Sequence, residues 1–109
     1  SWDRLERWIK QCEIRSYGLA NLFNHPLTSR PTKDQFKAAG EVIRPHVHKY
    51  TGVVALGNEA SAALKAAGIE HLRLPHPSPR TRQFNNPQYE PQLIVRLKQW
   101  LRDIGYYET

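Results

Sequence analysis

The stretch TGVVALGNEASAALKAAGIEHLRLP, residues 51–75, decides the fold class. Its apolar, β-branched start at 51–57 ends in glycine and is typical of a buried strand. Asn58 can cap the helix that follows, and Gly68 is a typical helix stop. The inner face of that helix is predicted to consist of Ala60, Ala63, Leu64 and Ala67. Residues 69–75 alternate in polarity, so the stretch predicts two parallel strands joined by a helical crossover.

An amphipathic helix is predicted near each end of the chain. Ser1 can cap the first helix, and its charged residues, which include Arg4 and Arg7, are expected to face away from the core. The inner face of this helix is predicted to consist of Trp2, Leu5, Ile9 and Cys12. The last helix is expected to end at Gly105. Its apolar stripe consists of Leu93, Leu97, Trp100, Leu101 and Ile104.

The remaining segments complete an alternation of helices and strands. Residues 16–23 are apolar enough for a short buried strand. Thr32, with Gln35 three residues later, matches a capping box, and Pro45 is expected to bend or break the helix that it opens. Phe36, Ala39, Ile43 and Val47 form the predicted inner face of that helix. The order predicts one α/β domain over residues 1–109, with a parallel sheet.

The composition restricts the partners that this chain can bind. Its net charge of +6 suits a phosphate-rich partner such as DNA. Its longest apolar runs are only a few residues, so no membrane span is predicted. A single cysteine, Cys12, can form neither an internal disulfide nor a thiolate cluster, and we predict no metal site and no cofactor. We expect an intracellular location, either cytoplasmic or associated with the nucleoid or nucleus.

A proline-rich loop follows the last predicted strand, where open α/β sheets bind their ligands. It lies within LRLPHPSPRTRQFNN, residues 72–86. Three prolines stiffen the backbone around His76, which suits a catalytic or binding group. Arg80 and Arg82 fit phosphate contacts, and Phe84 fits a side chain that probes base stacks. The alternative is a solvated surface turn in which the histidine is incidental.

Two other predicted strand ends carry candidate groups. The carboxamide of Asn21 offers a donor and an acceptor side by side, so it can hold its own loop or read the edge of a base. Gly57 lies at a strand-to-helix turn, where a helix N-terminus can bind an anion. One glycine in such a turn is ordinary, so the structural alternative stays open for both residues.

Together, these segments resemble the uracil-DNA glycosylase superfamily. LRLPHPSPRTRQFNN is similar to the second motif of that family, and the arginine after HPSP is most similar to the single-strand-selective monofunctional enzymes. YGLANLFNHPL resembles the strand that carries the base-reading asparagine, and residues 30–68 resemble the same region of the thermostable iron–sulfur members. The resemblance covers nearly the whole chain. It implies a three-layer α/β/α fold with a short, mostly parallel sheet.

The resemblance implies a function for each matching residue. His76 would donate a hydrogen bond to uracil O2 as negative charge spreads into the leaving base. Asn21 would hydrogen-bond the uracil edge, and Arg80 would fill the space left by the flipped nucleotide. The residues implied to press on the DNA backbone are Pro77, Ser78 and Pro79. Arg82 is expected to add a further DNA contact.

The chain departs from the family at the first motif, which would supply the residue that activates water. In the family this motif precedes the matching segments in sequence, and its strand lies in the sheet between the strands that correspond to YGLAN and GVVAL. The iron–sulfur cysteines are also missing from this chain. A sheet without its middle strand would leave buried backbone groups unpaired. We therefore expect that the chain is the downstream part of a longer domain, that it closes the sheet directly, or that a partner chain adds the strand.

Three functions are compatible with these features. The first is a monofunctional glycosylase that flips and excises uracil or a related pyrimidine from DNA by hydrolysis of the N-glycosidic bond. The alternative is a catalytically incomplete module of the same fold that binds DNA or a base. The third is an unrelated small α/β interaction protein. Only the first two predict a DNA affinity that falls as salt is added.

Overall fold

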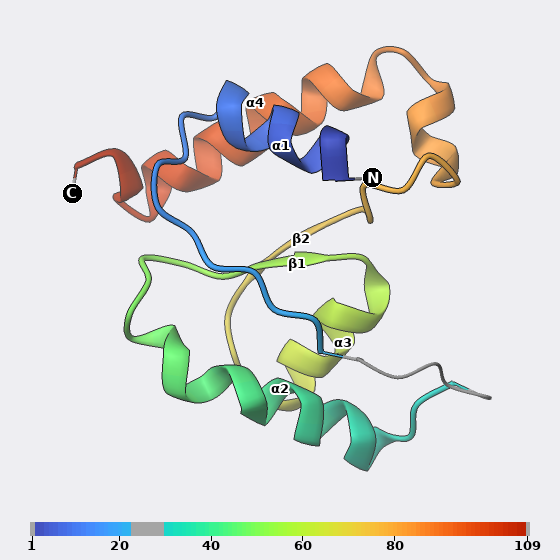
Figure 1. Ribbon diagram of the computed structural model, residues 1–109, viewed down its shortest axis with the longest axis vertical. Helices are drawn as coiled ribbons and strands as arrows, with labels where there is room; N and C mark the ends of the chain where they lie inside the picture. The colour runs from blue at the N-terminus through green and yellow to red at the C-terminus, as the bar shows by residue number, and fades with distance from the viewer. Residues whose placement is uncertain (1, 23–29, 109) are drawn as a thin grey trace. The chain divides into compact units, whose positions relative to one another are not determined.

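The computed structural model describes residues 2–22 and 30–108, and the chain divides into two compact units. The first unit combines Ser1–Tyr17 with Pro75–Thr109, and the second is Gly18–Leu74. The elements in chain order are α1 (Trp2–Gln11), α2 (Lys33–Val47), β1 (Val54–Leu56), α3 (Asn58–Ala66), β2 (Leu72–Leu74), the 3₁₀ turn η1 (Arg82–Asn85), α4 (Tyr89–Asp103) and the 3₁₀ turn η2 (Tyr106–Glu108) (Figure 1). The single domain expected over the whole chain stays a prediction.

The second unit is built on two parallel strands joined by α3. β1 and β2 pair with Val54 opposite Leu72 and Leu56 opposite Leu74. The Gly57 N–H extends this ladder by donating to the Leu74 carbonyl at 2.7 Å. The predicted strand, helix and parallel strand are confirmed, and the chain has a small α/β fold, although each strand is shorter than its apolar run. The three-layer arrangement stays a prediction.

Glycine defines both ends of α3. Its N-cap is Gly57, with a φ of 100°, and no side chain caps the helix. The prediction that Asn58 caps this helix is therefore wrong. Glycine can adopt a positive φ without strain, and α3 begins directly after Gly57, at Asn58. At the other end Gly68 has a φ of 71°, and the Ile69 N–H donates to the Leu64 carbonyl at 2.9 Å. This is the Schellman arrangement, which confirms the predicted stop.

α2 begins with the predicted capping box. The Gln35 N–H donates to Thr32 Oγ1 at 3.2 Å, and the Thr32 N–H donates to Gln35 Oε1 at 2.8 Å. The helix continues through Pro45 and ends at Val47, so the proline does not break it before its last turn. A proline this close to the end removes only one of the final hydrogen bonds, which the helix tolerates.

The core of the second unit lies where α2 packs against α3 and α3 packs against β1 (Figure 1). Gly40 is buried in α2 at the closest approach to α3. A Cβ on Gly40 would overlap the Ala63 carbonyl oxygen and would lie 2.8 Å from the Ala67 Cβ. The buried residues of this core are Phe36, Ala39, Ala55, Ala63, Leu64, Ala67 and Ile69. The inward faces predicted for α2 and α3 are confirmed at these positions.

The strand predicted over residues 16–23 is wrong for its described part. Residues 16–22 contain no strand, and Leu19 has 58% of its surface exposed. A strand requires a hydrogen-bonded neighbour, which apolar composition alone does not reveal.

The first unit places α1 beside α4 (Figure 1). The buried aromatic of α1 is Trp8, which is 1% exposed, whereas Trp2, predicted to face inward, is 46% exposed. Leu5 and Ile9 are half-buried and Cys12 is buried, as predicted, so the inward face is rotated away from Trp2 and toward Trp8. The Trp8 indole N–H donates to Glu90 Oε1 of α4. The apolar stripe of α4 and its end at Gly105 (φ 77°) agree with the prediction. Ser1, the predicted cap of α1, lies outside the described residues.

Candidate functional site

The proline-rich loop between β2 and η1 is held together by hydrogen bonds among its own residues. The Ser78 N–H donates to His76 Nδ1 at 3.2 Å, and the Arg80 N–H donates to Ser78 Oγ at 3.2 Å. Thr81 closes the loop. Its N–H donates to the Ser78 carbonyl at 3.1 Å, and its hydroxyl donates to the His76 carbonyl at 2.7 Å. The positions of His76 and Ser78 are therefore fixed by local bonds.

Proline shapes this network by limiting its donors. Pro75, Pro77 and Pro79 have no N–H, and the backbone donors of the network are Ser78, Arg80 and Thr81. Pro79 is the second residue of the turn closed between Ser78 and Thr81, the position at which a fixed φ suits a tight turn. Pro77 is buried and Pro79 is exposed. Of these two prolines, only Pro79 is accessible to a partner such as a DNA strand.

The hydrogen bond at His76 determines which ring nitrogen can donate. A ring nitrogen that accepts an N–H must carry its lone pair, so His76 Nδ1 is unprotonated in this arrangement. A neutral imidazole then carries its proton on Nε2. The His76 side chain is exposed. The loop thus presents one N–H donor on a stiff backbone.

The groups that follow His76 suit an anionic partner. Ser78 Oγ accepts from the Arg80 backbone, which leaves its hydroxyl proton to donate elsewhere. Ser78 is half-buried, and the side chains of Arg80 and Arg82 are exposed. A ring N–H, a hydroxyl and two guanidinium groups thus occur within seven consecutive residues of the chain.

Asn21 belongs to the second unit and is described there by itself. It is exposed and lies in a segment without strand structure. The other predicted site residues, His76, Pro77, Ser78, Pro79, Arg80 and Arg82, follow one another in the first unit. The base-reading function of Asn21 stays a prediction.

Phe84 of η1 is half-buried and packs against residues of its own unit, and its function as a probe of base stacks stays a prediction. Its ring centroid lies 5.8 Å from that of Trp8 and 5.8 Å from that of Tyr89, and the Arg4 guanidinium carbon lies 3.9 Å from it. Such contacts contribute both buried area and cation–π attraction. Phe84 anchors η1, and with it the end of the proline-rich loop, to α1 and α4.

Glu90 links the same two helices. Its Oε1 accepts from Trp8 Nε1 at 2.8 Å and from Arg7 at 3.0 Å, and Arg4 Nε lies at 3.9 Å. Burial by itself raises the pKa of the Glu90 carboxyl. The hydrogen bonds from Trp8 and Arg7 and the positive charges of Arg7 and Arg4 outweigh burial, so the pKa falls below its ordinary value. The carboxylate is therefore ionised and supports the loop through Trp8.

Sequence reasoning missed these supporting residues. Arg4 was expected to face away from the core, yet it is half-buried over Phe84. The spacing of Arg4 and Trp8, four residues apart, places them on one helix face and was the available signal. The position of Glu90, 82 residues after Trp8, gave no signal at all.

A serine and a histidine also meet in the second unit. Ser61 Oγ lies 2.8 Å from His71 Nε2, and His71 Nδ1 lies 2.8 Å from the Ile69 carbonyl oxygen. The carbonyl requires a proton on Nδ1, so the serine hydroxyl donates to Nε2 of the neutral ring. Ser61 is only 3% exposed. The pair lacks access to a substrate and acts as a structural hydrogen bond.

The described residues contain neither a metal-binding group nor a membrane helix. No three histidine, cysteine, aspartate or glutamate residues among them gather to hold a metal ion. No helix in the described ranges is long and apolar enough to cross a bilayer. Comparison with protein-family models, with curated proteins and with solved structures finds no match for this chain.

Proposed function

We propose that this chain binds DNA through Pro75–Arg82 and that His76 stabilises uracil, or a related pyrimidine, as the base leaves its sugar. The reaction is hydrolysis of the N-glycosidic bond within a three-layer fold of the uracil-DNA glycosylase kind. The observation that carries the proposal is the bond from the Ser78 N–H to His76 Nδ1, which leaves Nε2–H as the donor. A neutral donor of this kind stabilises an oxygen that gains negative charge in the transition state.

The reaction balances without a cofactor. Water oxygen forms a bond to C1′ of the deoxyribose while the bond between C1′ and N1 of the base breaks. The electron pair of that bond enters the base and spreads onto O2, where His76 Nε2–H donates its hydrogen bond. The water loses one proton to solvent, and the departing base takes one up. The products are the free base and an abasic site.

The neighbouring groups support a DNA strand at this loop. Arg80 and Arg82 are exposed and can contact phosphates, and the Ser78 hydroxyl can donate to a third. Flipping a nucleotide costs a few kcal/mol, least in single-stranded DNA, and insertion of Arg80 into the vacated space would offset part of that cost. Asn21 reads the base edge in this scheme.

A second candidate is a DNA-binding module without hydrolytic activity. Its support is that the described loop offers groups for phosphates and for a leaving base, whereas no group that activates water is assigned. Both candidates predict binding to single-stranded DNA that weakens as salt is added, because lysine and arginine contacts release counterions.

An excision assay separates the two candidates. The substrate is a single-stranded oligonucleotide with one uracil, and both the abasic product and the binding anisotropy are measured. The variants are wild type, His76→Ala and His46→Ala. His46 is an exposed histidine of α2 and serves as the matched control.

The proposal predicts uracil release by wild type and His46→Ala and a release rate lower by about 100-fold or more for His76→Ala, as for other lost transition-state donors. Binding should change little in both variants. Binding without release by any of the three proteins would reject the hydrolase and favour the binding module. The absence of salt-dependent binding would reject both.

A further inference from the structure

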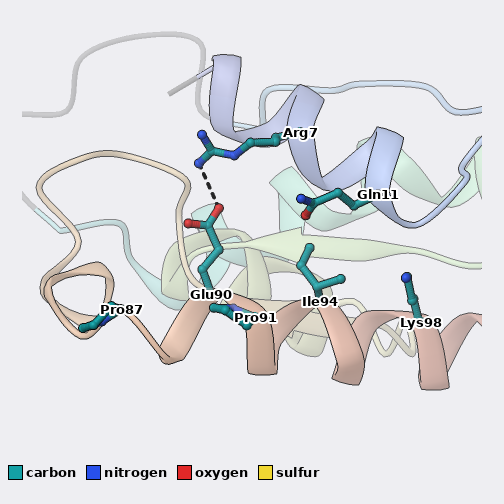
Figure 2. A pocket seen from close by; sticks show the side chains of 7 residues that line it. All are labelled: Arg7, Gln11, Pro87, Glu90, Pro91, Ile94 and Lys98. Atoms are coloured by element: carbon teal, nitrogen blue, oxygen red, sulfur yellow. Dashed lines mark hydrogen bonds and ion pairs between the residues drawn. The ribbon is translucent and has the colours of Figure 1, made fainter.

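A pocket of about 550 Å³ lies between α1 and α4 of the first unit (Figure 2). Its polar lining residues are Arg7, Gln11, Glu90 and Lys98. Its apolar lining residues are Pro87, Pro91 and Ile94. None of the seven belongs to the proline-rich loop, so the two features can be tested separately. The volume falls within the range of small-molecule sites.

The charges of this pocket are unequal at its two ends. Figure 2 shows the Arg7–Glu90 ion pair at one end and Lys98 at the other, with Gln11 and Ile94 between them. Arg7 and Glu90 compensate each other's charge. No carboxylate within the described ranges lies at ion-pair distance from Lys98. The lining therefore carries an excess positive charge, to which Arg4, 3.9 Å from Glu90, adds, and an anion complements it.

The region between the two ends suits a flat ring. Pro91 and Ile94 supply apolar surface on α4, and Gln11 projects from α1 opposite them (Figure 2). A carboxamide carries one acceptor and two donors, which is the pattern that pairs with the edge of a nucleobase. An ammonium group such as that of Lys98 binds phosphate as a point charge.

We propose that this pocket binds one nucleotide, with the base between Gln11 and the Pro91–Ile94 surface and the phosphate at Lys98. The inference stands on the pocket's own residues and does not require His76. A nucleotide within a strand and a free nucleotide share this chemistry. Among the lining residues Lys98 is the cation without a carboxylate partner, and its one charge matches a phosphodiester better than a free monoester, which carries up to two.

A titration of the whole chain, followed by backbone amide chemical shifts, tests the pocket. The probes are the dinucleotide TpT, thymidine monophosphate and inorganic phosphate. The variants are Lys98→Gln, Gln11→Ala, and Lys65→Gln as the control. Lys65 is an exposed lysine of α3, so its loss lowers the net charge equally without touching the pocket.

TpT should shift the backbone amide signals of the five lining residues that are not proline. Lys98→Gln should weaken TpT binding about fivefold, the effect of one partly exposed charge contact. Gln11→Ala should also weaken TpT binding, whereas Lys65→Gln should leave it unchanged. Equal weakening by Lys98→Gln and Lys65→Gln would overturn the site, as would inorganic phosphate binding as tightly as TpT. Binding of the monophosphate without TpT would overturn the assignment to a strand.

Discussion

Removal of the Glu90 carboxylate should destabilise the first unit in two separable steps. The variant Glu90→Gln keeps an oxygen that can accept from Trp8 Nε1, but it removes the negative charge beside Arg7 and Arg4. Glu90→Ala also removes the acceptor. The difference between the two variants therefore isolates the hydrogen bond to a tryptophan that is 1% exposed.

The two steps have different expected sizes. Arg7 is half exposed and Arg4 lies at 3.9 Å from the carboxylate, so loss of charge should cost about 1 kcal/mol. An indole N–H left buried without a partner costs about 1–3 kcal/mol more. We therefore expect Glu90→Gln to lower the free energy of unfolding by about 1 kcal/mol and Glu90→Ala by about 2–4 kcal/mol.

Tryptophan fluorescence during urea denaturation measures these values, because Trp2, Trp8 and Trp100 all belong to the first unit. Glu6→Gln is the control, since Glu6 is an exposed acid of α1 and its loss should cost less than about 0.5 kcal/mol. Equal losses for Glu90→Gln and Glu90→Ala would refute the hydrogen bond from Trp8. A loss within that control range for Glu90→Ala would refute the whole cluster.

The pH dependence of the same cluster has a fixed sign. Because the folded state lowers the pKa of Glu90, its contribution is complete above the ordinary value of 4.5 and is lost as pH falls through the lower, folded-state value. The difference in stability between wild type and Glu90→Gln should thus shrink in acid. A constant difference down to acidic pH would show that the carboxylate charge is not the cause.

Three further predictions concern the packed interior. Gly40→Ala should lower the stability of the second unit by about 1–2 kcal/mol, because the overlap with α3 outweighs the gain in helix propensity. The control is Val42→Ala on the exposed face of α2, which should change the stability by less than about 0.5 kcal/mol. Circular dichroism melts measure both variants. A stabilised Gly40→Ala would show that the helices do not approach closely there. Burial raises the pKa of the Cys12 thiol more than the positive charge of Lys98 lowers it. A thiol reagent should therefore label the native protein far more slowly than the urea-unfolded chain. Equal labelling rates would show that the thiol is exposed to solvent in the native protein. Ser61→Ala should cost about 1–2 kcal/mol in thermal unfolding by leaving a ring nitrogen of His71 without its donor, and an unchanged melting temperature would contradict that bond.

The parts of the fold that depend on local chemistry were predictable from sequence. The capping box at Thr32 and Gln35 and the glycine stop at Gly68 each involve neighbours within a few residues, and both are present. The strand, helix and strand of residues 51–75 also follow from a local alternation of patterns. The strand expected at 16–23 failed because it depended on a distant pairing partner that its own residues do not reveal.

The candidate site shows the same division. The prolines around His76 predicted a stiff loop, and the hydrogen bonds that hold it join residues no more than five apart. The anchoring of that loop was not predictable. It depends on Trp8, Phe84 and Glu90, which are brought together only by the packing of α1 against α4.

The tautomer of His76 decides whether the loop presents an N–H donor to a leaving base. Nitrogen-15 NMR of the imidazole rings distinguishes a proton on Nδ1 from one on Nε2 in the neutral ring. Ser78→Pro removes the N–H that donates to Nδ1, and Ser78→Ala keeps that N–H while removing the hydroxyl. We predict a single Nε2–H tautomer in wild type and in Ser78→Ala, and a mixture of tautomers in Ser78→Pro. A proton on Nδ1 in the wild-type protein would contradict the function proposed for His76. Nδ1 could not then accept the Ser78 N–H, and the loop would not fix Nε2–H as the donor to a leaving base.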